Sequence, residues 1–156
     1  MRAYDGINAD RGREVTLETP EFLEQARLLL AKGLPVVIRM SGTSMRPAIE
    51  DGDLVTVEPQ GDQIARAGDV ILYHSVRETA VIHRVVRIDR AQGEVVIITR
   101  GDASSQNDLP VPSHRVLGRV KMVERAGERI DVVSSRPRLR ERLRAWLTRL
   151  INRPGQ

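Results

Sequence analysis

Short runs of β-branched residues alternate with clusters of Gly, Pro, Asp and Asn over most of this sequence of 156 residues. Such runs are typical of strands, and the clusters are typical of turns. No helix-length pattern separates the runs, so strand–helix–strand units are not expected. The pattern predicts a mostly β fold, with a coiled antiparallel sheet or a partly open barrel. The expected strands are Pro35–Met40, Leu54–Val57, Asp69–Tyr73, Val81–Ile88, Glu94–Thr99, Arg115–Val123 and Arg129–Val133.

A helix is expected before the first strand. Thr19 to Glu21 has the composition of a helix start, with an N-cap residue, a proline in the first turn and an acidic residue. Gly33 is placed to end this helix as a left-handed residue. The apolar residues at helical spacing are Phe22, Leu23, Ala26, Leu29 and Leu30.

The end of the chain predicts a second, basic amphipathic helix. An arginine-rich face lies opposite an apolar face that includes a tryptophan, which suits a helix on an anionic membrane surface. Docking of this helix on the protein's own sheet fits the pattern equally well. The apolar face consists of Leu139, Leu143, Trp146, Leu147, Leu150 and Ile151.

Composition narrows the chemistry that the chain can perform. The sequence has no cysteine, which excludes disulfides, thiolate catalysis and cysteine-based zinc sites. The formal net charge is +4, and Lys32 and Lys121 are the only lysines. Arginine does not act as a base, because it keeps its proton in proteins. The charge is spread along the chain and aromatic residues make up only 3%, so nucleic acid is not an expected partner.

The apolar runs also bear on location. Met1 to Asp10 is polar, so no secretory signal is expected there, and no apolar run reaches the length that spans a bilayer. We therefore expect a cytoplasmic protein, either free in the cytosol or in peripheral contact with the inner membrane face through the C-terminal helix.

Ser41 to Ile49 is the first segment with candidate chemistry. A nucleophilic serine needs a sharp, exposed turn and nearby backbone N–H donors, and Gly42 allows a close backbone approach. The segment differs from the G-x-S-x-G elbow, because Arg46 stands where the second glycine would be. An ordinary turn explains the composition as well.

His83 and a long polar loop supply the other candidates. A histidine in an apolar strand is either a general base or a structural residue, whereas His74 and His114 are expected at the surface. The loop from Thr99 to Asp108 is either a solvated turn with Asp102 as a cap, or the source of a carboxylate for His83.

Taken together and in order, these stretches resemble the type I signal peptidases and the related repressor-cleaving peptidases. Histidine in place of the lysine base is similar to the archaeal and endoplasmic-reticulum branch of that group. The stretches that carry the resemblance are Ser41-Gly42-Thr43-Ser44-Met45-Arg46-Pro47, Asp51-Gly52-Asp53, Gly68-Asp69-Val70, Ile82-His83-Arg84-Val85, Thr99-Arg100-Gly101-Asp102 with Asp108 and Pro110, and Gly118-Arg119-Val120.

The resemblance implies a serine endopeptidase that acts on a protein or precursor peptide without a metal or cofactor. Ser44 is then the nucleophile and His83 the general base, with Asp108 as the first choice of orienting acid and Asp102 as the second. It further implies small residues before the cleaved bond. Residues expected at the oxyanion hole or the substrate are Gly42, Thr43, Met45 and Ser41, together with the backbone N–H of Ser44.

The helical patterns and the resemblance together predict three parts of the chain. Residues 1–34 form an N-terminal tail and helix, residues 35–134 a signal-peptidase-like β catalytic domain, and residues 135–156 the basic amphipathic helix. The alternative is a catalytically silent member of the fold that acts as a binding or regulatory module, peripheral to a membrane or to nucleic acid.

Overall fold

The computed structural model describes residues 20–61, 65–91, 93–130 and 132. The expected N-terminal tail, the N-cap at Thr19, the end of the last expected strand at Val133 and the expected helix in residues 135–156 lie outside the described residues.

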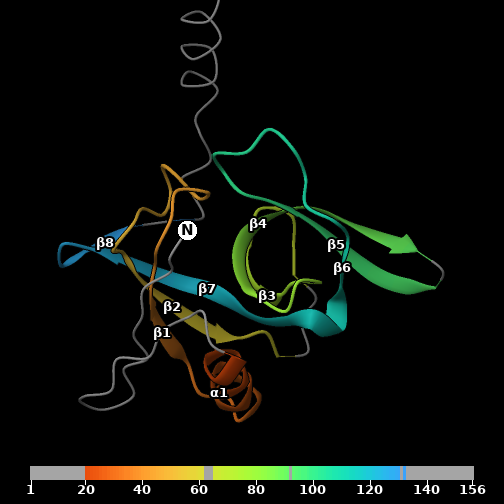
Figure 1. The fold of residues 1–156 in the computed structure, drawn as a ribbon, viewed down its shortest axis with the longest axis horizontal. Coiled ribbons are helices and arrows are strands. Elements are labelled where there is room, and N and C mark those ends of the chain that lie inside the picture. The colour runs from red at the N-terminus through yellow and green to blue at the C-terminus, as the bar shows by residue number, and fades with distance from the viewer. Residues whose placement is uncertain (1–19, 62–64, 92, 131, 133–156) are drawn as a thin grey trace, which may run out of the picture.

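One curled antiparallel sheet dominates the described part of the chain (Figure 1). Seven strands follow the order β1-β2-β7-β3-β4-β5-β6, and β8 pairs with β7. Every pairing is antiparallel, which confirms the mostly β prediction. The strands are β1 (Val36–Arg39), β2 (Leu54–Pro59), β3 (Val70–His74), β4 (Ala80–Ala91), β5 (Glu94–Arg100), β6 (Val111–Pro112), β7 (Val116–Arg125) and β8 (Glu128–Ile130).

Helix α1 (Pro20–Ala31) packs against β1, β2 and β7 at one end of the sheet (Figure 1). Its buried face consists of Phe22, Ala26 and Leu30, as the helical spacing predicts. The helix ends at Gly33, whose φ of 80° is left-handed. The N–H of Leu34 donates to the carbonyl of Leu29 at 3.0 Å, which satisfies a carbonyl of the last helical turn.

Strand β3 contributes to two separate cores because successive side chains of a strand point to opposite faces. Val70 and Leu72 enter the larger core, which also contains α1, β1 and β2. Ile71 and Tyr73 enter a smaller core together with residues of β4, β5 and β6. Strand β3 is therefore buried on both faces, and β4 pairs directly with it.

The structure differs from the sequence pattern at two places. Strand β6 and the 3-10 turn Ser113–Arg115 were not expected, because Pro110 and Pro112 flank or occupy a strand of only two residues. Strand β4 is longer than expected, and its register with β5 shifts between Val85 and Arg87. This bulge breaks the simple alternation of faces that the sequence suggests.

Candidate active site

Ser44 lies on the loop that connects β1 to β2, and its side chain is exposed. The loop is anchored by three of its side chains that are buried in the larger core, those of Met45, Ala48 and Ile49. Gly42 adopts a φ of 108°, and its N–H donates to Oδ1 of Asp51 at 2.9 Å. The loop therefore presents the hydroxyl of Ser44 on a turn that is held by buried side chains and by the hydrogen bond to Asp51.

Asp53 closes the same loop. Its side chain is 2% exposed, and the guanidinium of Arg125 donates to both carboxylate oxygens at 2.9 and 2.8 Å. Burial raises the pKa of Asp53, but hydrogen bonds from the Arg125 side chain and from the Glu50 backbone outweigh burial and hold this pKa below its usual value. The ionised carboxylate ties the loop of Ser44 to β7.

His83 lies on β4, opposite Ile71 of β3 in the register. It shares a face of β4 with Val81, because the two residues are separated by two positions. Its Nε2 lies 3.2 Å from Oγ of Ser44, and the two residues are 39 positions apart in the chain. The sheet thus brings a histidine to hydrogen-bond distance of the exposed serine.

Asp108 completes a chain of hydrogen bonds behind His83. Its Oδ2 lies 2.7 Å from Nδ1 of His83 and accepts hydrogen bonds from Oγ1 of Thr99 at 2.8 Å and from the hydroxyl of Tyr73 at 3.3 Å. The N–H of Asp108 also donates to the carbonyl of Thr99 at 2.8 Å. Three side chains therefore hold the carboxylate, and the backbone bond holds the main chain of Asp108. The sequence pattern does not predict that Thr99 and Tyr73 bind this carboxylate.

Tyr73 is 3% exposed, and burial raises the pKa of its hydroxyl to about 12. The negative charge of Asp108 raises this pKa further, while a hydrogen bond from Thr99 works against the shift. The phenol consequently stays protonated and keeps its hydrogen bond to the carboxylate.

Asp102, the second candidate for the orienting acid, faces a different residue. Arg84 donates to its Oδ1 at 2.7 Å and to its Oδ2 at 2.6 Å. The side chain of Arg84 is 11% exposed and that of Asp102 is 7% exposed. Arg84 also donates to the carbonyls of Gly68 and Val132 at 2.9 and 3.1 Å. The structure therefore brings Asp108 to His83 and leaves Asp102 in a buried ion pair.

Gly101 allows the acidic loop to lie directly against Ser44. A Cβ atom on Gly101 would stand 2.6 Å from the carbonyl oxygen of Ser44 and 3.1 Å from Nε2 of His83. The next contact along the loop is a 2.9 Å hydrogen bond from the N–H of Ala103 to the same carbonyl. The sequence pattern does not predict this contact, because the need for a missing side chain depends on the neighbouring loop of Ser44.

The remaining predicted residues lie around Ser44. Ser41 and Gly42 are half-buried and Thr43 is exposed, whereas the side chain of Met45 is 2% exposed and packs in the larger core. The N–H of Gly42 is already engaged with Asp51. Their parts in oxyanion or substrate binding stay predictions.

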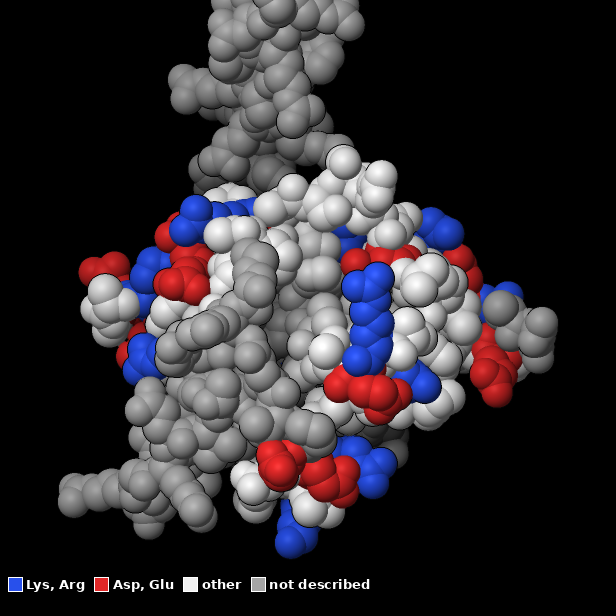
Figure 2. Space-filling view, in the orientation of Figure 1, with Lys and Arg blue, Asp and Glu red and all other residues white. Residues whose placement is uncertain are grey.

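The charged groups outside the site are mixed in sign. Figure 2 shows Lys and Arg interspersed with Asp and Glu on the face it displays. Among the described residues, no three His, Cys, Asp or Glu side chains gather closely enough to hold a metal ion. Within the same residues, no helix has the length and apolar character needed to cross a bilayer.

Comparison with known proteins places this sequence in a family. The family described as Peptidase S24-like matches residues 6–121. The signal peptidase complex catalytic subunit SEC11 of Lachancea thermotolerans is 33% identical over 84 residues, which is 52% of this chain and 49% of that protein.

The human signal peptidase complex catalytic subunit SEC11C is 30% identical over 97 residues, covering 56% of this chain and 50% of that protein. The chain thus spans about half the length of these curated relatives. Because the family match extends over most of the sequence, the chain belongs to the Peptidase S24-like family.

Proposed function

We propose that this protein is a serine endopeptidase in which Ser44 attacks the substrate, His83 is the general base and Asp108 orients the histidine. The observation that carries the proposal is the continuous path from Oγ of Ser44 through the imidazole to Oδ2 of Asp108, with contacts of 3.2 and 2.7 Å. Membership of a peptidase family supports the same reading.

In the first half of the reaction, Oγ of Ser44 forms a bond to the peptide carbonyl carbon while its proton moves to Nε2 of His83. The resulting imidazolium has Nδ1–H directed at Asp108, whose negative charge stabilises it. The tetrahedral intermediate then collapses, the C–N bond breaks, and Nε2 returns the proton to the leaving amine. An acyl-enzyme on Ser44 remains.

In the second half, a water molecule replaces the amine. Nε2 of His83 takes a proton from this water as its oxygen attacks the ester carbonyl, and the proton then returns to Oγ of Ser44 as the ester bond breaks. The acid product leaves and the site is restored. Neither half needs a metal or an organic cofactor in this scheme.

The negative oxygen of each intermediate needs hydrogen-bond donors. The backbone N–H of Ser44 belongs to the same turn as its hydroxyl and is our first assignment. Gly42 has no side chain, and its N–H is engaged by Asp51, so the exposed hydroxyl of Thr43 is the second candidate. Removal of one such donor costs about 10²–10³ in rate in other serine peptidases.

The substrate class follows from the relatives. Because they carry the name of signal peptidase complex catalytic subunits, we assign a protein or precursor peptide as substrate. Small residues before the cut bond are part of the proposal on the strength of the motif resemblance around Ser44. A cytoplasmic location with peripheral membrane contact through residues 135–156 belongs to the same proposal, and the basic, tryptophan-containing pattern of that segment supports it.

A cleavage assay tests the proposed function. The full chain is incubated with a library of peptides from a digested proteome, and new termini are identified by mass spectrometry. We expect cleavages that disappear in Ser44→Ala and in His83→Ala. Identical peptide patterns for the wild type and Ser44→Ala would contradict the proposal.

A further inference from the structure

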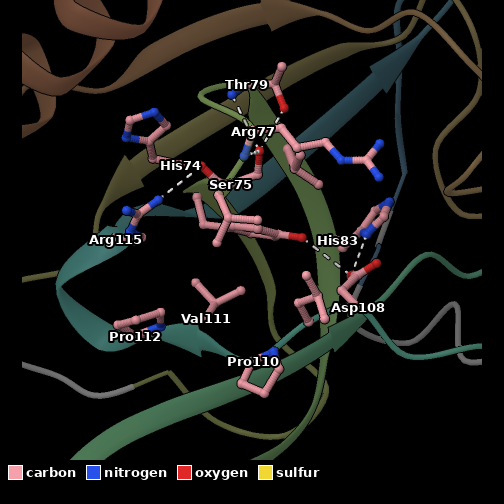
Figure 3. Close-up of a pocket in the computed structure, with 14 residues that line it drawn as sticks. His74, Ser75, Arg77, Thr79, His83, Asp108, Pro110, Val111, Pro112 and Arg115 are labelled. Carbon is pink, nitrogen blue, oxygen red and sulfur yellow. Dashed lines mark hydrogen bonds and ion pairs between the residues drawn. The ribbon is translucent and has the colours of Figure 1, made fainter.

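A pocket of about 380 Å³ opens beside His83 and Asp108 (Figure 3). Its walls come from the end of β3, the β3–β4 turn, the start of β4 and the segment that follows Asp108. The apolar part of the wall consists of Tyr73, Val76, Val81, Leu109 and Val111. Val76 and Leu109 are 57% and 68% exposed, so the apolar surface is accessible from solvent.

The proposed reaction places one part of the substrate at this pocket. Nε2 of His83 must reach the leaving nitrogen to return its proton, so this nitrogen lies within hydrogen-bond distance of the imidazole. This nitrogen belongs to the first substrate residue after the cut bond, and the side chain of that residue is attached to the adjoining Cα. It therefore lies alongside His83, whose ring forms one wall of the pocket.

Charges at the rim indicate which residues are preferred. Glu78 pairs with His74 at 2.8 Å and lies 4.0 Å from Arg115, and Asp108 pairs with His83. Among the described residues, Arg77 has no carboxylate partner, and in Figure 3 it lies at the end of the pocket that holds His83. An exposed cation in the lining of this pocket favours an acidic residue in the bound peptide by Coulomb attraction.

Hydrogen bonds hold the turn that carries Arg77. Oγ of Ser75 lies 2.8 Å from Oγ1 of Thr79 and accepts hydrogen bonds from the N–H groups of Arg77 and Thr79 at 3.2 and 3.3 Å. Arg115 donates to the carbonyl of Ser75 at 3.0 Å. The backbone beneath Arg77 is therefore held in place, which limits the ordering cost of an ion pair at its side chain.

We infer that this pocket, which rests on the proposed function for its role, binds the substrate on the leaving-group side of the cut bond. It takes an apolar side chain from the first residue after the bond, and Arg77 selects an acidic residue next to it. Arg77 is a specificity residue in this assignment and takes no part in the chemical steps.

A charge reversal tests the assignment with the same peptide library. The proteins compared are the wild type, Arg77→Glu, Ser44→Ala and the matched control Arg90→Glu, which makes the same charge change at an exposed position of β4 opposite Val95. For the wild type we expect an apolar residue first and an acidic residue second after the cut, with acid favoured over lysine by about two- to fivefold at low salt.

Arg77→Glu should reverse this preference, and Arg90→Glu should retain it. Cleavage that depends on Ser44 but has the same second-position preference in Arg77→Glu would overturn the subsite and leave the proposed function standing. A preference that changes only before the cut would also overturn it. An absence of Ser44-dependent cleavage would overturn the proposed function, and the subsite with it.

Discussion

Gly101 offers the sharpest test of how the acidic loop positions Ser44. In Gly101→Ala, the new Cβ would stand 2.6 Å from the carbonyl oxygen of Ser44, whereas an ordinary carbon–oxygen contact is about 3.3 Å. The two backbones must therefore separate by roughly 0.7 Å. The same Cβ would stand 3.1 Å from Nε2 of His83, so the new side chain would displace both Ser44 and His83, the two proposed reacting residues.

A misplacement of about 1 Å can cost about 10²-fold in rate, so we expect Ser44 to react about 10- to 100-fold more slowly in Gly101→Ala. The corresponding rise in barrier is about 1.4–2.7 kcal/mol. The folded state should lose about 1–3 kcal/mol from overpacking. The assay is the rate of Ser44 labelling by a serine-directed acylating probe, with urea unfolding to measure stability.

Gly118→Ala is the matched control, because its Cβ would stand 2.5 Å from the carbonyl oxygen of Glu58, where β7 passes β2. It should lose similar stability and keep a labelling rate close to that of the wild type. Labelling of Gly101→Ala at the wild-type rate, or an equal loss of labelling in both variants, would refute the reasoning.

Two further predictions concern the surroundings of the site, and a third concerns the C-terminal segment. Arg84→Met leaves the buried carboxylate of Asp102 without its partner and should lower the free energy of unfolding by about 3–5 kcal/mol, measured in urea; a loss below 1 kcal/mol would contradict this. Tyr73 should titrate near pH 12: in Tyr4→Phe, which leaves Tyr73 as the only tyrosine, absorbance at 295 nm should stay low at pH ~10. Since the pKa of Tyr73 is raised in the folded state, the stability that Tyr73 contributes is complete below pH ~10 and is lost as the pH rises through about 12. A tyrosinate signal at pH ~10 in the folded protein would disprove the raised pKa. Trp146→Glu should weaken sedimentation of the full chain with anionic vesicles, and equal sedimentation of both proteins would argue against a membrane-binding helix.

Much of the fold could be predicted because its signals are local. Runs of β-branched residues marked the seven longer strands, and Gly33 marked the end of α1 through its left-handed φ. Strand β6 gave no such signal, since it is held by its pairing with β5 rather than by its own composition. The bulge after Val85 likewise depends on the partner strand.

The site was predictable as a set of segments but not as a set of contacts. The sequence pointed to Ser44 and His83, and it ranked Asp108 before Asp102 without a contact to decide between them, since the two lie six positions apart in one polar loop. The choice depends on the neighbours across the sheet: Arg84 occupies Asp102, whereas Thr99 and Tyr73 direct Asp108 to the histidine. Such neighbours are fixed by strand register, which the sequence pattern alone does not determine.

The most direct measurement of the central claim is the labelling of the full chain by a serine-directed acylating probe, with the adduct mapped by mass spectrometry. The account predicts an adduct on Ser44 in the wild type and in the surface control Asp89→Asn, whose pair with Arg87 lies on the β4–β5 hairpin. It predicts a loss of about 10³-fold or more in labelling rate for His83→Ala and Asp108→Asn. Labelling of Ser44 that survives in His83→Ala, or that is unchanged in Asp108→Asn, would contradict the Ser44–His83–Asp108 assignment.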